Sequence, residues 1–302
     1  MTFAEFLSQA WTDHGDQADA VASRIEQGLA LCNTPDEIIA LVNLTTHLYS
    51  EHIQKFVEGE RKLREIGKNP LAIGTPAEFA VTRAAMAFRL CEGTIDPAKD
   101  RLGLTPGDLV RSLAVAASAL ATRDSVRAES YLNSALETVS SLELTSGDGI
   151  ARGLAIAGNN SATSLEALAE RSEQQTTFML RAAQTARKYW EIAGTWLEVE
   201  RAEYRFARSC LKADLITQAR EHAKACLAIC EQNNAAPLEL FFAYECLATV
   251  ESTALAATPG AGATAASPSA ALDAAKTKSR EWFEKMDPED KSWARKSLEA
   301  LG

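Results

Sequence analysis

A pair of helical patterns joined by a very short connection constrains the fold of this chain most strongly. Between residues 194 and 230, apolar and small residues recur every three or four positions, which is the spacing of one face of an α-helix. The pattern predicts helices over 194–212 and 215–232, with Ala213 and Asp214 as the turn between them. Two helices joined so closely must pack against each other, so this segment predicts a helix hairpin.

The rest of the chain is also predicted to be helical. Alanine is abundant, it loses no side-chain entropy in a helix, and no segment shows sustained alternation of period two. Thr105-Pro106 and Asp287-Pro288 indicate helix starts, because proline is tolerated at the first helical position. Helices are predicted at 2–14, 17–32, 36–66, 77–93, 106–121, 125–142, 149–170, 173–192, 194–212, 215–232, 237–256, 272–286 and 289–300.

Small and large apolar residues recur in several of these helix pairs in similar order. The segment 194–230 has Phe206-Ala207 in its first helix and Ala219, Ala223, Cys226 and Leu227 in its second. Related patterns are Val115-Ala116 followed by Ala128, Leu132 and Ala135-Leu136, and Ala157-Gly158 in the next predicted pair. This arrangement resembles the tetratricopeptide repeat family. The resemblance implies an all-α, antiparallel helix-hairpin solenoid with an irregular N-terminal helical section and a C-terminal capping helix.

Four regions are predicted along the chain. Residues 1–100 form an acidic N-terminal helical section with one repeat-like unit and a long helix at 36–66, and residues 101–255 hold the helical repeats. Residues 256–271 are rich in Ala, Gly, Pro and Ser and predict a flexible loop. Residues 272–302 supply helices that close the end of the stack, as terminal repeats must.

Charge and hydropathy exclude several classes of function. The chain has 31 basic and 41 acidic residues, a net charge of −10 that disfavours nucleic-acid binding. No apolar run approaching the length of a membrane span is apparent, and the N-terminus lacks the basic and apolar regions of a secretory signal, so we expect a cytoplasmic protein without integral membrane association. The six cysteines lie in apolar helical patterns and are expected to be reduced core residues.

Motifs for catalysis, cofactors and metals are absent from the sequence. There is no HExxH, GxGxxG, GxSxG or P-loop pattern, so no enzyme activity, cofactor or metal site is predicted. His47 and His52 are five residues apart, which is off one face of an α-helix. Cys226 and Cys230 are one helical turn apart, but no further ligand spacing supports a metal site. Gly147, Gly149, Gly153 and Gly158 indicate a helix start and close-packing positions.

A row of basic residues is the strongest candidate for a functional site. Arg201, Arg205, Arg208 and Lys212 follow spacings of four, three and four, which places them on one helical stripe in an acidic protein. In the tetratricopeptide family, the first helix of each unit lines a concave groove that binds peptides. The resemblance therefore implies a groove that also presents Arg152, Asn159 and Tyr204. The alternative is a solvated helix face whose arginines pair with nearby glutamates such as Glu198.

The sequence therefore predicts a non-catalytic scaffold or adaptor that binds a protein or peptide, through an acidic or C-terminal segment gripped by arginine and asparagine. Two alternatives belong to other classes. One is a sensor that binds a small acidic ligand within the helical superhelix. The other is a coat or self-assembly protein that uses the 36–66 helix, which is weakly similar in composition to the phasins.

Overall fold

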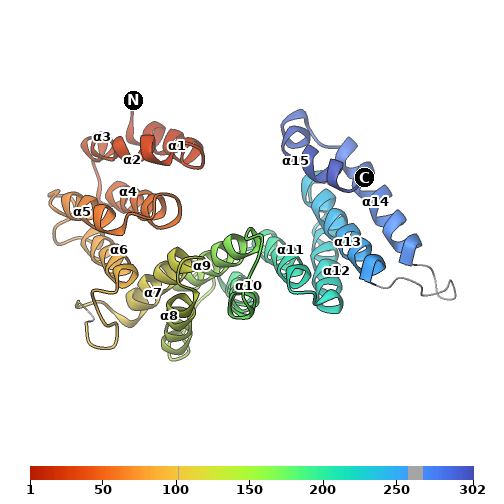
Figure 1. Cartoon of the computed structure of the whole chain (residues 1–302). Coiled ribbons are helices and arrows are strands. Elements are labelled where there is room, and N and C mark those ends of the chain that lie inside the picture. The colour runs from red at the N-terminus through yellow and green to blue at the C-terminus, as the bar shows by residue number, and fades with distance from the viewer. Residues whose placement is uncertain (101, 258–267) are drawn as a thin grey trace. The chain divides into compact units, whose positions relative to one another are not determined.

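The computed structural model describes residues 1–100, 102–257 and 268–302. All regular secondary structure in this described part is helical, which confirms the all-α prediction (Figure 1). The chain divides into two compact units, Met1–Leu144 and Thr145–Gly302. This division does not coincide with the predicted boundary at residue 100, because the helices on either side of that boundary contact each other within the first unit.

The first unit contains eight α-helices and one π-helix among its described residues. Several α-helices begin at Thr-Pro pairs, one of them the predicted pair Thr105-Pro106. Thr34 and Thr105 each accept a hydrogen bond from the third backbone amide of the helix, with proline at the first helical position. The elements are α1 (Phe3–Asp13), α2 (Ala18–Ser23), α3 (Ile25–Leu31), α4 (Pro35–His47), η1 (Leu48–His52), α5 (Phe56–Gly67), α6 (Pro76–Glu92), α7 (Pro106–Leu120) and α8 (Ser125–Val139).

The long helix predicted at 36–66 is wrong. Helix α4 passes into the π-helical turn η1, in which the Ile53 amide donates to the Leu48 carbonyl at 2.8 Å. Gln54 then adopts a positive φ of 54°, which a continuous helix does not allow, and α5 begins at Phe56. The unbroken helix on which the coat-protein alternative depended is therefore absent.

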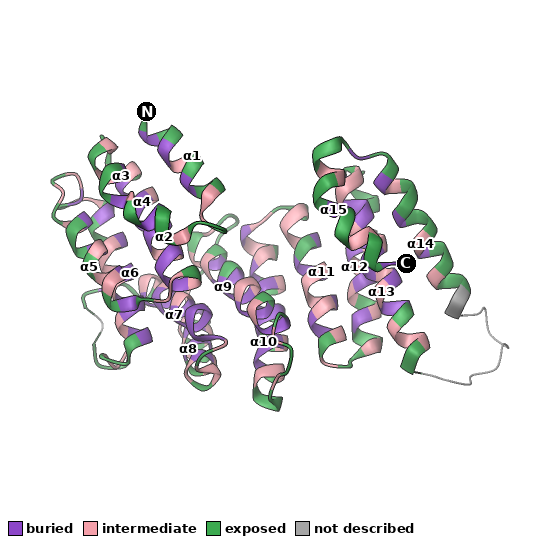
Figure 2. Ribbon diagram, turned by 45° about the horizontal axis from the view of Figure 1, so that its top comes forward, coloured by how far each residue is buried: buried purple, intermediate pink, exposed green. Residues whose placement is uncertain are grey.

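The second unit is a succession of packed helices. They are α9 (Gly149–Glu166), α10 (Glu173–Ala193), α11 (Trp196–Lys212), α12 (Ile216–Gln232), α13 (Pro237–Ala257), α14 (Pro268–Glu284) and α15 (Pro288–Ala300). Each contacts the next, and α11 also contacts α9 and α13. Small buried side chains fill the contact between α11, α12 and α13, including Ala207, Ala219, Ala223 and Cys246, and Figure 2 shows buried residues along these helices. Most of the predicted loop at 256–271 lies outside the described residues.

Gly158 sets the closest approach between α9 and α10. A Cβ atom at this position would lie 2.5 Å from the Ala182 carbonyl oxygen and 2.8 Å from the Ala186 amide nitrogen. The amide of Gly147 also donates to the Ile192 carbonyl at 3.0 Å. Because residues earlier in one helix meet residues later in the other, α9 and α10 run antiparallel. The predicted close-packing role of Gly158 is confirmed.

Substitution of Gly158 with alanine is expected to destabilise the second unit. The added methyl group meets backbone atoms of α10, which cannot rotate away, so the two helices must separate. We expect the free energy of unfolding to fall by about 2 kcal/mol, although alanine favours helix more than glycine does. Urea denaturation followed by circular dichroism measures this change. Gly149→Ala, where no atom lies within 4 Å of the new Cβ, is the matched control.

Helix α13 is long and apolar enough, by length and composition alone, to cross a membrane. This differs from the prediction that no such segment exists. Three glutamates of α13, Glu239, Glu245 and Glu251, are nevertheless buried against arginines of α11 and α12. Such interhelical ion pairs are typical of a helix in a protein core. A core helix can be as long and as apolar as a membrane-spanning helix.

Candidate functional site

A pocket of about 430 Å³ opens on the second unit beside the predicted basic row. It is formed by side chains from α9, α11, α13 and α15. Four of the seven predicted site residues line it, namely Asn159, Arg201, Tyr204 and Arg205. The remaining lining residues are Glu200, Leu238, Glu239, Phe242 and Trp293.

The arginines of α11 are paired with carboxylates from the helices on either side. Arg201 contacts Glu239 of α13 at 2.5 Å, and Arg205 contacts Glu166 of α9 at 2.5 Å. Both carboxylates are buried, and Glu166 also accepts a hydrogen bond from the Ser209 hydroxyl at 2.6 Å. The basic row is thus neither a simple solvated face nor an unpaired cationic strip. Its arginines form ion pairs with buried glutamates of neighbouring helices.

Three of the predicted site residues do not line the pocket. Arg208 pairs with Glu245 at 3.4 Å, and Lys212 is exposed near the end of α11. The Arg152 guanidinium stacks on Trp190 at 5.3 Å and donates to the Ala193 carbonyl at 2.8 Å. Arg152 therefore fastens α9 to the end of α10 rather than facing a shared groove with Asn159.

Buried glutamates are the feature of this unit that the sequence did not reveal. Six of them are nearly inaccessible to solvent: Glu166, Glu200, Glu203, Glu239, Glu245 and Glu251. A partial signal existed, because Glu245 and Glu251 stand among apolar residues in a helix whose sequence contains no basic residue. Their partners come from other helices, such as Arg220 of α12 for Glu251 at 2.6 Å. Pairing of that kind depends on tertiary contacts and not on local spacing.

Glu200 differs from the other buried glutamates because it forms no ion pair with any residue that the structure describes. One carboxylate oxygen, Oε1, accepts a hydrogen bond from the Cys226 thiol at 2.9 Å, whereas Oε2 has no hydrogen-bond partner among the described residues. Burial raises the pKa of Glu200 to about 7, with a further contribution from repulsion by Glu239, while the Cys226 thiol opposes the change. A large fraction of this carboxyl group is therefore protonated near neutral pH. The pocket wall carries less negative charge than its composition implies.

The same carboxylate lies close to two thiols. Ligand atoms of Glu200, Cys226 and Cys230 are within 4.8 Å of one another. The pKa of the Cys226 thiol is raised, first by its hydrogen bond with Cys230 and then by burial. Both cysteines are fully buried, and the raised pKa of Cys226 disfavours the thiolate that metal binding needs, so we interpret the two thiols as core residues.

Aromatic side chains form the apolar wall of the pocket. Phe242 packs edge-on against Tyr204, with ring centroids 6.0 Å apart, and against Trp293, at 4.9 Å. The Tyr204 hydroxyl donates to Glu245 at 3.1 Å, which fixes the ring. Trp293 is 66% exposed, an unusual position for so large an apolar side chain. The pocket thus combines guanidinium donors with an aromatic surface.

Comparisons with known proteins add no family. The chain matches no protein-family model, and no curated protein matches it. The function must therefore be inferred from the geometry of the site.

Proposed function

We propose that this protein is a non-catalytic binding protein of the helix-hairpin repeat type, which takes a carboxylate-bearing segment of a partner protein into the pocket on α11 and α13. The single observation that carries the proposal is the convergence of Arg201, Arg205 and Asn159 with three aromatic side chains around one pocket. Antiparallel packing of α9 on α10 and the contacts of α11 with both α9 and α13 support a solenoid of tetratricopeptide type.

Arg201 is the residue best placed to grip the carboxylate. Its side chain is 62% exposed, whereas that of Arg205 is 25% exposed. The contact with Glu239 uses Nη2 of Arg201, and a guanidinium has further N–H donors in a planar fork. Arg201 can therefore hold Glu239 and a ligand carboxylate together. Phe242 and Trp293 would accept an apolar side chain next to that carboxylate.

A peptide library with free C-terminal carboxylates tests the proposal. We expect enrichment of peptides that end in an apolar residue, or that have an apolar residue beside an acidic residue. Where a peptide binds through its C-terminus, amidation of that C-terminus should weaken binding. Arg201→Lys should weaken binding of the selected peptide by about tenfold or more, because lysine keeps the positive charge but lacks the planar set of N–H donors of a guanidinium. Lys212→Met, which removes a charge outside the pocket, should leave binding unchanged.

Two results would reject the proposal. One is that the native chain enriches no peptide more strongly than the variant Arg201→Lys does. The other is equal loss of binding in Arg201→Lys and Lys212→Met, since that pattern would reflect net charge alone. Melting curves of both variants show whether the fold is intact.

A sensor for a small acidic ligand is favoured by one observation, the size of the pocket. A volume of about 430 Å³ is sufficient for a single small molecule. Small dicarboxylates that raise the melting temperature, with no effect from any peptide, would support this second function over the first.

A further inference from the structure

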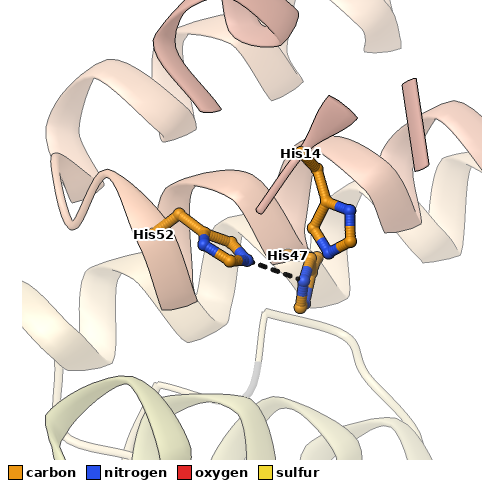
Figure 3. A group of neighbouring side chains, drawn as sticks. All are labelled: His14, His47 and His52. Atoms are coloured by element: carbon orange, nitrogen blue, oxygen red, sulfur yellow. Dashed lines mark hydrogen bonds between the residues drawn. The ribbon is translucent and has the colours of Figure 1, made fainter. Parts of the chain in front are cut away.

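Three of the four histidines of the chain meet in the first unit, far along the sequence from the pocket described above. His14 follows α1 directly, His47 ends α4, and His52 ends the π-helical turn η1. Their ring centroids are 4.9–5.0 Å apart in all three pairs. Figure 3 shows the three rings as neighbours, with His47 and His52 joined by a dashed line, and we refer to these residues as the histidine cluster.

The π-helical turn is the reason that the sequence did not reveal this cluster. The prediction that His47 and His52 do not share one helical face assumed an α-helix, in which residues five apart lie on different faces. In a π-helix the hydrogen bonds join residues five apart, as the Ile53 amide and the Leu48 carbonyl do at 2.8 Å. The wider turn places His47 and His52 one above the other, and their Nε2 atoms are 3.1 Å apart.

Hydrogen bonding leaves a nitrogen of His14 available as a ligand. The Nδ1 atom of His14 lies 2.6 Å from the carbonyl oxygen of Trp11, so Nδ1 carries the proton and donates it. Its Nε2 atom then has a lone pair. Orientation of one ring nitrogen by a backbone carbonyl is how proteins commonly prepare histidine for metal binding.

The spacing of the ligand atoms matches a small transition-metal ion. One ring nitrogen from each member of the cluster lies within 4.8 Å of the others. Zinc–nitrogen bonds of about 2.0–2.1 Å in a tetrahedral site require nitrogens roughly 3.3 Å apart. The Nε2 atoms of His47 and His52 are already at about this separation, 3.1 Å.

The surroundings of His47 favour its neutral form, which is the form that binds metals. Burial, together with repulsion from His52 and His14, lowers the pKa of His47 to about 4. The Trp11 ring covers one side, 5.1 Å from the His14 ring and 5.2 Å from that of His47.

We propose that the histidine cluster binds one Zn²⁺ ion, or a similar borderline divalent transition metal, through three imidazole nitrogens. Three protein ligands leave a fourth position for water or for a ligand atom from outside the chain. The ion would also join the end of α1 to the end of α4. It would therefore stabilise the N-terminal helix, which the contacts of Phe3, Phe6 and Ala10 otherwise hold in place.

Titration of the untagged, metal-free full chain with Zn²⁺ tests this proposal. Calorimetry should show one site per chain, and the melting temperature should rise with Zn²⁺. Co²⁺ should give the intense visible absorption of a tetrahedral site, and Cu²⁺ should quench the fluorescence of the neighbouring Trp11. His14→Gln and His52→Gln should each weaken Zn²⁺ binding by about 100-fold or more.

Two matched variants change possible metal ligands outside the histidine cluster. His222→Gln removes the histidine of the second unit, and Cys226→Ala removes a thiol beside Glu200; both should retain the Zn²⁺ affinity. Because His14 and His52 lie at helix ends and are not buried, their metal-free variants should melt within a few degrees of the metal-free native chain. Absence of stoichiometric binding, unaltered affinity in His14→Gln, or loss of the site in Cys226→Ala would each overturn the proposal.

Discussion

Replacing Arg205 with methionine should lower the free energy of unfolding of the second unit by about 3 kcal/mol. The Arg205 guanidinium contacts Glu166 at 2.5 Å, and the Glu166 side chain is only 8% exposed. Without Arg205 the carboxylate stays buried and loses its direct ion pair, which leaves the Ser209 hydroxyl and the weaker attraction of Arg208 to compensate its charge. Arg205→Glu should be worse, because it places a second negative charge beside Glu166. Urea denaturation at neutral pH measures both effects.

The double variant Arg205→Met, Glu166→Gln identifies the cause. Removing both charges together should restore most of the lost stability, since a buried ion pair contributes little beyond an uncharged pair of similar volume. Lys212→Met on the same helix should change the free energy of unfolding by less than about 0.5 kcal/mol. A loss below about 1 kcal/mol in Arg205→Met would contradict the structural role of the pair.

This pairing changes how the basic row can be tested. From the sequence, reversing Arg201 and Arg205 together should abolish partner binding and leave melting unchanged. The contact with Glu166 makes Arg205 a stability residue, so loss of binding in that variant would be ambiguous. Arg201 is the informative position for binding, because its side chain is more exposed than that of Arg205. At Arg205, the double variant Arg205→Met, Glu166→Gln separates an effect on binding from an effect on folding.

Local signals in the sequence were sufficient to predict most helices. Threonine caps followed by proline, as at Thr34 and Thr105, specify where a helix starts through contacts within one turn. The prediction of Gly158 as a close-packing position also succeeded, because a glycine inside an otherwise good helix has few other uses. These features depend on neighbours within a few residues, which the sequence displays directly.

The two candidate sites depend on contacts that the sequence does not display. The π-helical turn changes the face on which His52 lies, and no residue type between Leu48 and His52 specifies that turn. The glutamates beside the basic row are about 40 residues away in sequence, as in Arg205–Glu166 and Arg208–Glu245. Helical spacing placed the arginines on one stripe correctly. It could not show that packing supplies buried acids to pair with them.

Replacing Glu200 with glutamine should stabilise the second unit at alkaline pH. Burial raises the pKa of Glu200 from an ordinary value of 4.5 to about 7, so between these values the folded state binds more protons than the unfolded state. The contribution of Glu200 to stability is therefore present below about pH 4.5 and is lost as pH rises through 7. At about pH 8.5 the native chain must bury a charged Glu200, and the glutamine variant need not. We expect a gain of about 1–3 kcal/mol there and little difference near pH 5.

Glu203 on the same helix provides the control with the opposite sign. Burial favours a raised pKa for Glu203, but hydrogen bonds from His222 and Arg187 outweigh it, and the pKa is lowered. Glu203→Gln should therefore destabilise the unit at about pH 8.5, because Arg187 loses its buried partner. The two carboxyl groups are both buried and three residues apart, and they differ in whether a cation faces them. Equal effects of the two substitutions across this pH range would show that burial alone, and not pairing, governs the acids of this unit.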